Sequence, residues 1–265
     1  MGLAIDLWLE ARLVEGEGPT IYRGTLEHLD PARDLFTATF VAESPPGGTH
    51  LEVESRIPVG KGLGSSAAAI VAALALADLA RGLELRQDTI FDRASRIEGH
   101  PDNAGPAVYG GLFLASSHRT QLKLNSEVGI ALAIPEASID TRQARALLPE
   151  QISREAAIGQ AACAAALVLG LTGGEPELIA FGMEDHIAVP CRRKLIIGYD
   201  AAVRAGLEAG AWGVTISGAG SALLAFAPKA AAAEVAGAMA QALTRAGNPA
   251  RDLAPEPSDR GLTIL

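Results

Sequence analysis

The sequence predicts an α+β fold, and three segments carry that prediction. Residues Thr49–Ile57 alternate apolar and polar side chains, which is the period of a strand with one solvent-facing side. Residues 65–82 are dominated by alanine and leucine, both strong helix formers, and end at a glycine. The short apolar runs Trp212–Ile216 and Ala222–Phe226 flank a glycine-rich turn, as the two strands of a hairpin do.

Composition places the chain among folded, soluble proteins. Hydrophobic residues make up 49% of the 265 residues and charged residues 20%, so burial can offset chain entropy. This length accommodates one large domain or two small packed ones. We expect two, with their boundary near Asn125 and domains at residues 1–124 and 125–265. The 22 Lys and Arg against 31 Asp and Glu give a formal charge of −9, which disfavours nucleic acid as a general partner.

Neither a secretory signal nor a membrane span is predicted. Met1–Leu9 is apolar but lacks a basic leader, so we expect it to belong to a strand over Gly2–Val14. Ala67–Leu76, taken as the longest apolar stretch, is shorter than the roughly 20 residues that a bilayer requires. Cys163 and Cys191 have no metal-ligand spacing and form no disulfide framework. The expected location is therefore a reducing cytoplasm, with no membrane partner.

The remaining elements follow from turn formers and apolar periodicity. Asp88 is expected to cap a helix that ends at Gly99. Residues 15–48 mix turn formers with short pieces that fit either a helix or a strand. Other helices are expected over 141–148, 152–169, 176–184, 199–209 and 229–246, and strands over 110–116, 128–134 and 262–265.

A glycine-rich loop before the alanine-rich helix is the strongest local signal. Glycines at alternate positions let backbone N–H groups turn toward one point, and the helix that follows carries partial positive charge at its amino end. Such a loop is suited to phosphates, although it has neither the Walker A order nor the dinucleotide G-x-G-x-x-G. The plainer alternative is a glycine turn with a serine N-cap. The candidate nucleotide-binding residues are Pro58, Gly60, Lys61, Gly62, Leu63, Gly64, Ser65 and Ser66.

A second glycine loop, Ser217–Ser221, follows about 150 residues later. The first loop resembles the P-x-x-x-G-L-G-S-S-A motif of the GHMP kinases, and the second resembles the late glycine motif of that family. The resemblance implies a first half like ribosomal protein S5 domain 2, a ferredoxin-like second half, and ATP as the phosphate donor. It also assigns Gly218 and Gly220 to the nucleotide.

The segment Glu98–Asn103 resembles the homoserine kinase branch of this family. The resemblance implies that Glu98 holds Mg²⁺ together with Ser66, and that His100 and Asn103 contact the substrate. Ser66, Glu98 and Asn103 are accordingly the candidate catalytic residues. A physical observation supports the metal at Glu98, because a carboxylate at a helix C-terminus is locally unfavourable by a few tenths to about 1 kcal/mol. A divalent cation would remove that conflict. The alternatives are a solvent-exposed glutamate and a hydrogen-bonded turn histidine; the role of Asp102 is left open.

Two arginines are candidates for holding a substrate carboxylate. Guanidinium groups offer paired donors in a plane that matches both carboxylate oxygens. The segments around Arg145 and Arg192 resemble two arginine segments of homoserine kinases, which implies that both arginines bind the substrate. Either arginine alone would fit a solvated surface charge equally well.

One family motif has no counterpart in the sequence. The family's A-N-L-G-P-G-F-D-x-L motif comes before the strand that Gly2 begins here, so either the natural start lies further upstream or the chain is a shortened member. The resemblance implies MgATP-dependent phosphorylation of the L-homoserine hydroxyl in threonine biosynthesis. The alternatives are a GHMP kinase for another small alcohol and a catalytically impaired nucleotide-binding member. Homodimers are common in this family.

Overall fold

The computed structural model describes residues 1–43, 47–115 and 119–265. The chain divides into two compact units, which we describe separately. Unit 1 contains Met1–Val59, Gly64–Lys123 and Pro257–Leu265, and unit 2 contains Gly60–Leu63 and Leu124–Glu256. Four residues of the first glycine loop therefore belong to unit 2, although the segments on both sides of them belong to unit 1.

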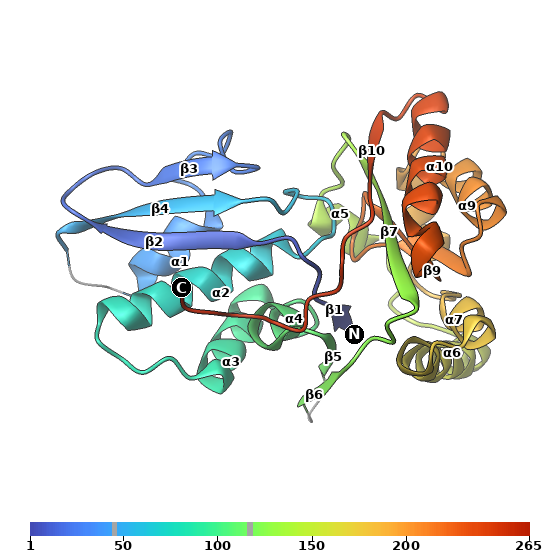
Figure 1. Cartoon of the computed structure of the whole chain (residues 1–265), viewed down its shortest axis with the longest axis horizontal. Coiled ribbons are helices and arrows are strands. Elements are labelled where there is room, and N and C mark those ends of the chain that lie inside the picture. The colour runs from blue at the N-terminus through green and yellow to red at the C-terminus, as the bar shows by residue number, and fades with distance from the viewer. Residues whose placement is uncertain (44–46, 116–118) are drawn as a thin grey trace. The chain divides into compact units, whose positions relative to one another are not determined.

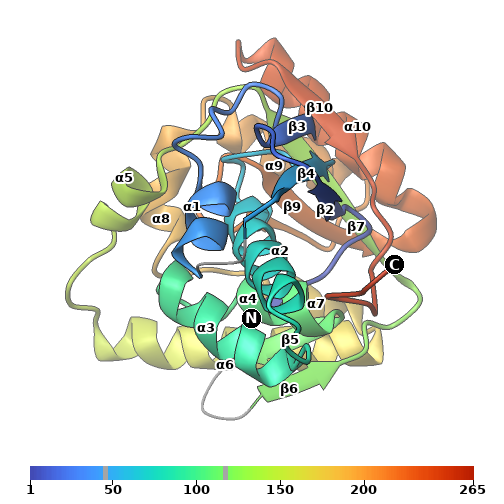
Figure 2. The ribbon, with the colours of Figure 1, turned by 90° about the vertical axis from the view of Figure 1, so that its left-hand side faces the viewer.

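The first part of unit 1 is a three-stranded sheet covered by helices (Figure 1). Apolar residues of the sheet and helices form one buried cluster, which includes Phe36, Val53 and Ala73. Figure 2 looks along α2, with α1 and α3 next to it. The elements are β2 (Leu9–Glu15), β4 (Thr49–Ser55) and β3 (Ile21–Gly24), in that order across the sheet, with helices α1 (Leu35–Ala42) and α2 (Ser65–Ala80).

The second part of unit 1 packs against residues of α2 that do not belong to the first cluster. Ile70 and Leu74 of α2 share a buried cluster with Ile90, Phe91 and Phe113. A small antiparallel sheet completes this part, in the order β1-β5-β6. Its elements are α3 (Gln87–Glu98), α4 (Ala104–Tyr109), β1 (Gly2–Leu3), β5 (Leu112–Ala115) and β6 (Arg119–Leu122).

The predicted N-terminal strand over Gly2–Val14 is wrong as a single element. The structure has two strands there, β1 and β2, and they belong to different sheets. The chain turns between them, because the N–H of Leu7 donates to the carbonyl of Ile5 at 2.7 Å and the indole of Trp8 donates to Asp6 at 2.6 Å. These two local bonds hold a bend that the apolar pattern alone does not reveal.

The helix after the glycine loop is confirmed, and so is its glycine stop. Gly82 adopts a φ of 69° just past the end of α2, and the next N–H donates back to the carbonyl of Asp78 at 2.9 Å. The predicted cap at Asp88 is wrong, since α3 already begins at Gln87. The Asp88 carboxylate instead accepts from the Tyr109 hydroxyl at 2.6 Å.

Unit 2 contains a four-stranded antiparallel sheet with two helices side by side on one face (Figure 1). Ala225 and Ala227 from the sheet pack against Met239 and Leu243 from the longer helix. The strands are β10 (Ala250–Leu253), β7 (Val128–Pro135), β9 (Leu223–Pro228) and β8 (Gly213–Ile216), in sheet order, and the helices are α9 (Tyr199–Glu208) and α10 (Ala232–Arg245). Strand β7 and the β8–β9 hairpin confirm the sequence prediction.

The last predicted strand, over residues 262–265, is wrong. The final strand is β10, and Ala250 lies opposite Pro135 of β7. Leu262 instead donates its N–H to the carbonyl of Val108 at 3.0 Å. The helix predicted over 229–246 begins with a short 3₁₀ turn at Lys229–Ala231, which precedes α10.

The remaining helices of unit 2 lie in the chain segment between β7 and α9. They are α5 (Thr141–Ala146), α6 (Arg154–Gly173), α7 (Pro176–Gly182), α8 (Val189–Arg192) and the 3₁₀ turn Arg193–Leu195. Helices α6 and α7 approach closely, because added Cβ atoms at Gly170 and Gly182 would lie 2.7 Å and 2.4 Å from the other helix's backbone.

Helix α6 is also longer and more apolar than the sequence reading anticipated, which took Ala67–Leu76 as the longest apolar stretch. By length and composition alone α6 could cross a membrane. The core helices of soluble proteins pass the same test. The absence of a membrane partner therefore stays a prediction.

Candidate active site

The two predicted glycine loops pack directly against each other within unit 2. An added Cβ at Gly62 would lie 2.0 Å from the carbonyl oxygen of Ser217. The Ser217 hydroxyl donates to the Gly62 carbonyl at 2.8 Å, and the N–H of Ala222 donates to the Lys61 carbonyl at 3.1 Å. Gly62 also has a φ of 76°, a conformation that favours glycine. The late loop thus fixes the shape of the first one through backbone groups.

The Lys61 ammonium is turned away from the loop's own backbone. It donates to the carbonyl of Glu136 at 2.5 Å and to the hydroxyl of Ser138 at 2.9 Å, at the end of β7. The residue is buried, and this burial lowers the pKa of Lys61. Lys61 therefore joins the glycine loop to the end of β7 through its side chain.

The loop continues without interruption into the first turn of α2 in unit 1. Gly64 is the N-cap, with a φ of 77°. The N–H groups of the first turn, including those of Ser65 and Ser66, have no partners within the helix, and the helix dipole adds partial positive charge there. Ser66 is exposed and Ser65 is partly exposed. This end of α2 is chemically suited to an anion.

Glu98 and Ser66 come together at the ends of two helices in unit 1. Glu98 is the last residue of α3, and its side chain is 9% exposed. The Ser66 hydroxyl donates to a Glu98 carboxylate oxygen at 2.5 Å. The structure therefore brings both predicted metal ligands into contact, although 32 residues separate them in the sequence.

These two groups fit the chemistry of Mg²⁺. Both are hard oxygen donors, and Mg²⁺ is bound in proteins by one or two such groups together with water and substrate phosphates. Adjacent ligands of an octahedral Mg²⁺ lie about 2.9 Å apart. The 2.5 Å between the Ser66 and Glu98 oxygens would widen slightly to admit the ion. A nearly buried carboxylate at the negative end of α3 also gains electrostatically from a cation.

His100 lies between two carboxylates. Its Nδ1 is 2.5 Å from an Asp102 carboxylate oxygen, and its Nε2 is 3.8 Å from a Glu98 oxygen. Because a carboxylate accepts hydrogen bonds, Nδ1 carries the proton in this contact. A neutral His100 therefore presents Nε2 as an acceptor. Asn103 follows as the N-cap of α4, and its side chain makes no capping hydrogen bond.

The N-terminal residues lie beside this same segment. An added Cβ at Gly2 would meet the Asp102 carbonyl oxygen at 2.2 Å and the Pro106 ring at 2.6 Å. Residues at the start of β1 are therefore in direct contact with the turn that carries Asn103.

The two predicted substrate arginines share one neighbourhood in unit 2. Arg192 donates to the carbonyl of Ala144, which precedes Arg145 in α5, and to the carbonyl of Gly218, both at 3.1 Å. Burial, and the positive charge of nearby Arg145, lower the pKa of Arg192, whereas Asp185 raises it. Arg145 itself is exposed. Two nearby guanidinium groups that repel each other, one of them in contact with the late glycine loop, are suited to an anionic partner.

Sequence reasoning missed some residues that shape this region. Ser138 receives Lys61, and Ser217 ties the two loops together. Asp185 accepts the N–H groups of three successive residues, Ile187, Ala188 and Val189, at 2.7, 2.6 and 3.3 Å, and so fixes the start of α8. An aspartate readily bonds the backbone N–H two residues on, so Asp185 could have been read as a turn residue. No local pattern marks the pairing of Lys61 with Ser138.

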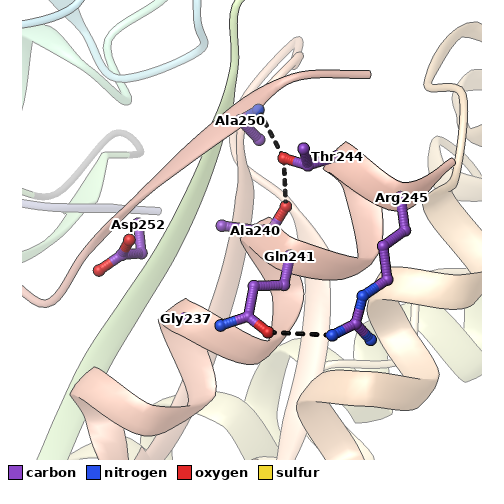
Figure 3. Close-up of a pocket in the computed structure, with 7 residues that line it drawn as sticks. All are labelled: Gly237, Ala240, Gln241, Thr244, Arg245, Ala250 and Asp252. Carbon is purple, nitrogen blue, oxygen red and sulfur yellow. Dashed lines mark hydrogen bonds between the residues drawn. The ribbon is translucent and has the colours of Figure 1, made fainter. Parts of the chain in front are cut away.

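A surface hollow on unit 2 lies away from the predicted residues. It has a volume of about 270 Å³ and lies along α10 and β10 (Figure 3). Thr244 bonds to Ala240 and Ala250 there, and Arg245 bonds to Gln241. Because these polar groups already have partners within the protein, the hollow offers few groups for a ligand. It contains none of the predicted site residues.

Comparisons with known proteins identify the family of the chain. Residues 26–111 match the GHMP kinases N terminal domain and residues 176–245 match the GHMP kinases C terminal domain. The chain is 37% identical to the homoserine kinase of a Synechocystis species over 265 residues, covering 98% of this chain and 85% of the relative. It belongs to the GHMP kinase family. The homoserine kinase of Trichormus variabilis is 40% identical over 213 residues, covering 78% of this chain and 70% of that one.

Solved structures show the same two-domain GHMP kinase fold. The crystal structure of homoserine kinase from Cytophaga hutchinsonii matches with a TM-score of 0.78 and 28% identity, covering 96% of this chain and 86% of that one. The L. major mevalonate kinase in complex with R-mevalonate has a TM-score of 0.67 at 16% identity, covering 97% and 88%, and shows the fold alone. The predicted α+β GHMP kinase fold is confirmed, and the chain is a member of a family of small-molecule kinases.

Proposed function

We propose that this GHMP kinase transfers the γ-phosphate of ATP to the hydroxyl of L-homoserine, giving ADP and O-phospho-L-homoserine. The observation that carries the proposal is the arginine pair. Arg192 contacts Gly218 of the late glycine loop and lies near Arg145, and homoserine presents a carboxylate that two guanidinium groups can hold. Relatives that are 37–41% identical and named homoserine kinase support this choice of substrate.

ATP is proposed to bind along the two glycine loops. Backbone N–H groups of Gly60–Gly64 and of the first turn of α2 would hold its phosphates, and Gly218 and Gly220 would approach them from the late loop. Ser66 and Glu98 would hold Mg²⁺, which neutralises the charge that develops on the transferring phosphoryl group. The side chain of Lys61 acts indirectly in this proposal, since it positions the loop through its hydrogen bonds to Glu136 and Ser138.

In this proposal, different residues bind the carboxylate of homoserine and its amino group or hydroxyl. Its carboxylate would face the two arginines, and its amino group or hydroxyl would donate to Nε2 of His100. Asp102 holds the other ring nitrogen in the protonated form and so keeps Nε2 as an acceptor. Asn103 supplies amide groups and no base, so in this proposal the hydroxyl proton passes to the transferring phosphoryl oxygens.

Resemblance to the family supports the remaining parts of the proposal. We propose that the reaction belongs to threonine biosynthesis, needs Mg²⁺, and takes place in the cytoplasm. The partner is a small molecule, with neither nucleic acid nor a membrane involved, and a homodimer is the assembly that resemblance to the family favours.

An ADP-release assay tests the proposed function. The purified chain would be supplied with MgATP and, in separate reactions, L-homoserine, mevalonate or galactose. Homoserine should release ADP at least about 100-fold faster than the other two, because neither mevalonate nor galactose carries an α-amino acid group. Faster release with mevalonate or galactose would overturn the substrate. A chain that binds ATP and phosphorylates none of the three would be an impaired member of the family.

Asn103 provides a sharper test of the proton's path. Asn103→Asp adds a carboxylate of nearly the same shape beside the proposed hydroxyl. ATP affinity should stay within about twofold, while kcat should change and acquire a new pH dependence. Loss of ATP affinity would place Asn103 with the nucleotide instead.

A further inference from the structure

A cluster of three metal-ligating side chains lies in unit 2, outside the residues assigned above. Cys163 comes from the middle of α6, and Glu184 and His186 come from the turn after α7. One ligand atom from each lies within 4.8 Å of the other two. Only the described residues were searched for such groups.

The histidine is the centre of the cluster. Its Nε2 lies 3.7 Å from the Cys163 sulfur and 3.9 Å from a Glu184 carboxylate oxygen. Sulfur and nitrogen ligands of a tetrahedral Zn²⁺, at about 2.3 Å and about 2.0 Å from the ion, lie about 3.5 Å apart. The separation of the Cys163 sulfur and His186 Nε2 is therefore about 0.2 Å from that in a zinc site, and the Glu184 carboxylate would move about half an ångström toward the histidine to complete the set.

The position of His186 is fixed by α6 at three successive contacts. Its backbone N–H donates to the Gln160 side chain at 2.9 Å. Its ring lies over Gly159, where an added Cβ would be 3.3 Å from Nε2. One turn further along the helix, Cys163 faces the same nitrogen. The imidazole is thus held in place before any ligand arrives, which lowers the entropic cost of binding one.

We infer that Cys163, Glu184 and His186 form a binding site for one Zn²⁺ ion, separate from the Mg²⁺ site proposed at Ser66 and Glu98. Thiolate, imidazole and carboxylate are the zinc ligands found in proteins, and three of them leave a fourth position for water. Mg²⁺ prefers oxygen ligands alone and is a poor match for this set.

The site would connect α6 to the turn that leads into α8. Glu184 and His186 flank Asp185, whose carboxylate fixes the start of α8. The ion would therefore add a cross-link between α6 and this turn. Zn²⁺ binds the folded arrangement and not the dispersed ligands, so it should stabilise unit 2 against unfolding.

Zinc binding tests the inference without reference to kinase activity. The full chain, untagged and metal-free, would be titrated with Zn²⁺ in competition with a chromophoric chelator. We expect one ion per chain, undiminished by excess Mg²⁺, and release of about one proton to the buffer as the thiol becomes a thiolate. Co²⁺ in place of Zn²⁺ should give a thiolate-to-cobalt charge-transfer band.

Variants distinguish Zn²⁺ bound at this site from Zn²⁺ bound elsewhere on the chain. Cys163→Ser should abolish the charge-transfer band, and Cys191→Ser, at the other free cysteine, should keep it. Cys163 is fully buried, so the exposed His186→Ala provides a second test in which folding is not at risk. It should weaken Zn²⁺ binding at least about 100-fold and remove the thermal stabilisation by Zn²⁺. The inference is overturned by absence of stoichiometric binding, by a band that depends on Cys191, or by unchanged affinity in His186→Ala.

Discussion

The two units hold their functional groups by opposite means. In unit 1, side chains bond to side chains: Ser66 to Glu98, and His100 to Asp102. In unit 2, side chains bond to backbone carbonyls, as Lys61, Arg192 and Ser217 do. A substitution in the unit 1 group should change local charge and leave the backbone in place. A substitution in the unit 2 group releases a backbone carbonyl and should change both the site and the fold.

Gly62→Ala should give the largest effect. Gly62 belongs to the unit 2 group, where its carbonyl accepts the Ser217 hydroxyl. The new Cβ would lie 2.0 Å from the Ser217 oxygen, and φ at this position is 76°. We expect about 2–4 kcal/mol lower stability in urea unfolding and activity below about 1%. Gly82→Ala is the matched control, with a φ of 69° and nothing within 4 Å of the added atom. It should cost only about 1 kcal/mol. Equal costs would show that contact with Ser217 is unimportant.

Glu98→Gln tests the side-chain-held region. The amide keeps the shape of the carboxylate and removes the charge that would hold Mg²⁺. We expect kcat to fall about 100-fold or more, with a higher Mg²⁺ requirement. The unfolding free energy from urea unfolding should stay within about 1 kcal/mol of the unsubstituted chain. Glu84→Gln, at an exposed glutamate, is the control. A large loss of stability in Glu98→Gln would contradict the contrast between the units.

Arg192→Lys should affect substrate binding more than catalysis. Lysine keeps the charge but lacks the planar fork that reaches the carbonyls of Ala144 and Gly218. KM for homoserine should rise about tenfold or more, while KM for ATP changes less than about threefold. Arg193→Lys, at the neighbouring and more exposed arginine, should change neither. A change confined to KM for ATP would move Arg192 from the amino acid to the nucleotide.

Tyr109→Phe provides the smallest effect, at a position outside both groups. Burial and the hydrogen bond to Asp88 raise the pKa of Tyr109 to about 12. The folded state therefore favours the neutral phenol, and this stabilisation is complete below about pH 10 and lost as pH rises toward about 12. The variant should be less stable than the unsubstituted chain at pH 8, and the difference in unfolding free energy should shrink between pH 10 and 11. A difference that stays constant would contradict the role of the phenol.

Much of the fold was predictable because local chemistry decided it. The helix over Ser65–Ala80 follows from its alanine and leucine content, and its end follows from Gly82. The strand β10 was missed because its partner β7 lies over 100 residues earlier, and only pairing with that strand defines it. The break between β1 and β2 was missed because it depends on an aspartate that accepts a tryptophan N–H.

The candidate site likewise has features that the sequence predicts and features that only tertiary packing decides. Resemblance identified Ser66 with Glu98 and the two glycine loops, and the structure brings each of these pairs together. The direction of the Lys61 side chain was not predictable, because burial beside Glu136 and Ser138 decides it. The Cys163–His186 contact was also out of reach, since the α6–α7 hairpin alone brings the two residues together.

The place of Gly60–Leu63 within unit 2 has a consequence for hybrid enzymes made from two relatives. A hybrid spliced once, near Asn125, would inherit this tetrapeptide from one parent and its hydrogen-bonding hosts, Ser217 and Ala222, from the other. Transplanting the tetrapeptide together with the C-terminal half would keep the original partners matched. Successful recombination in this lineage should therefore need a second, very short crossover inside the glycine loop.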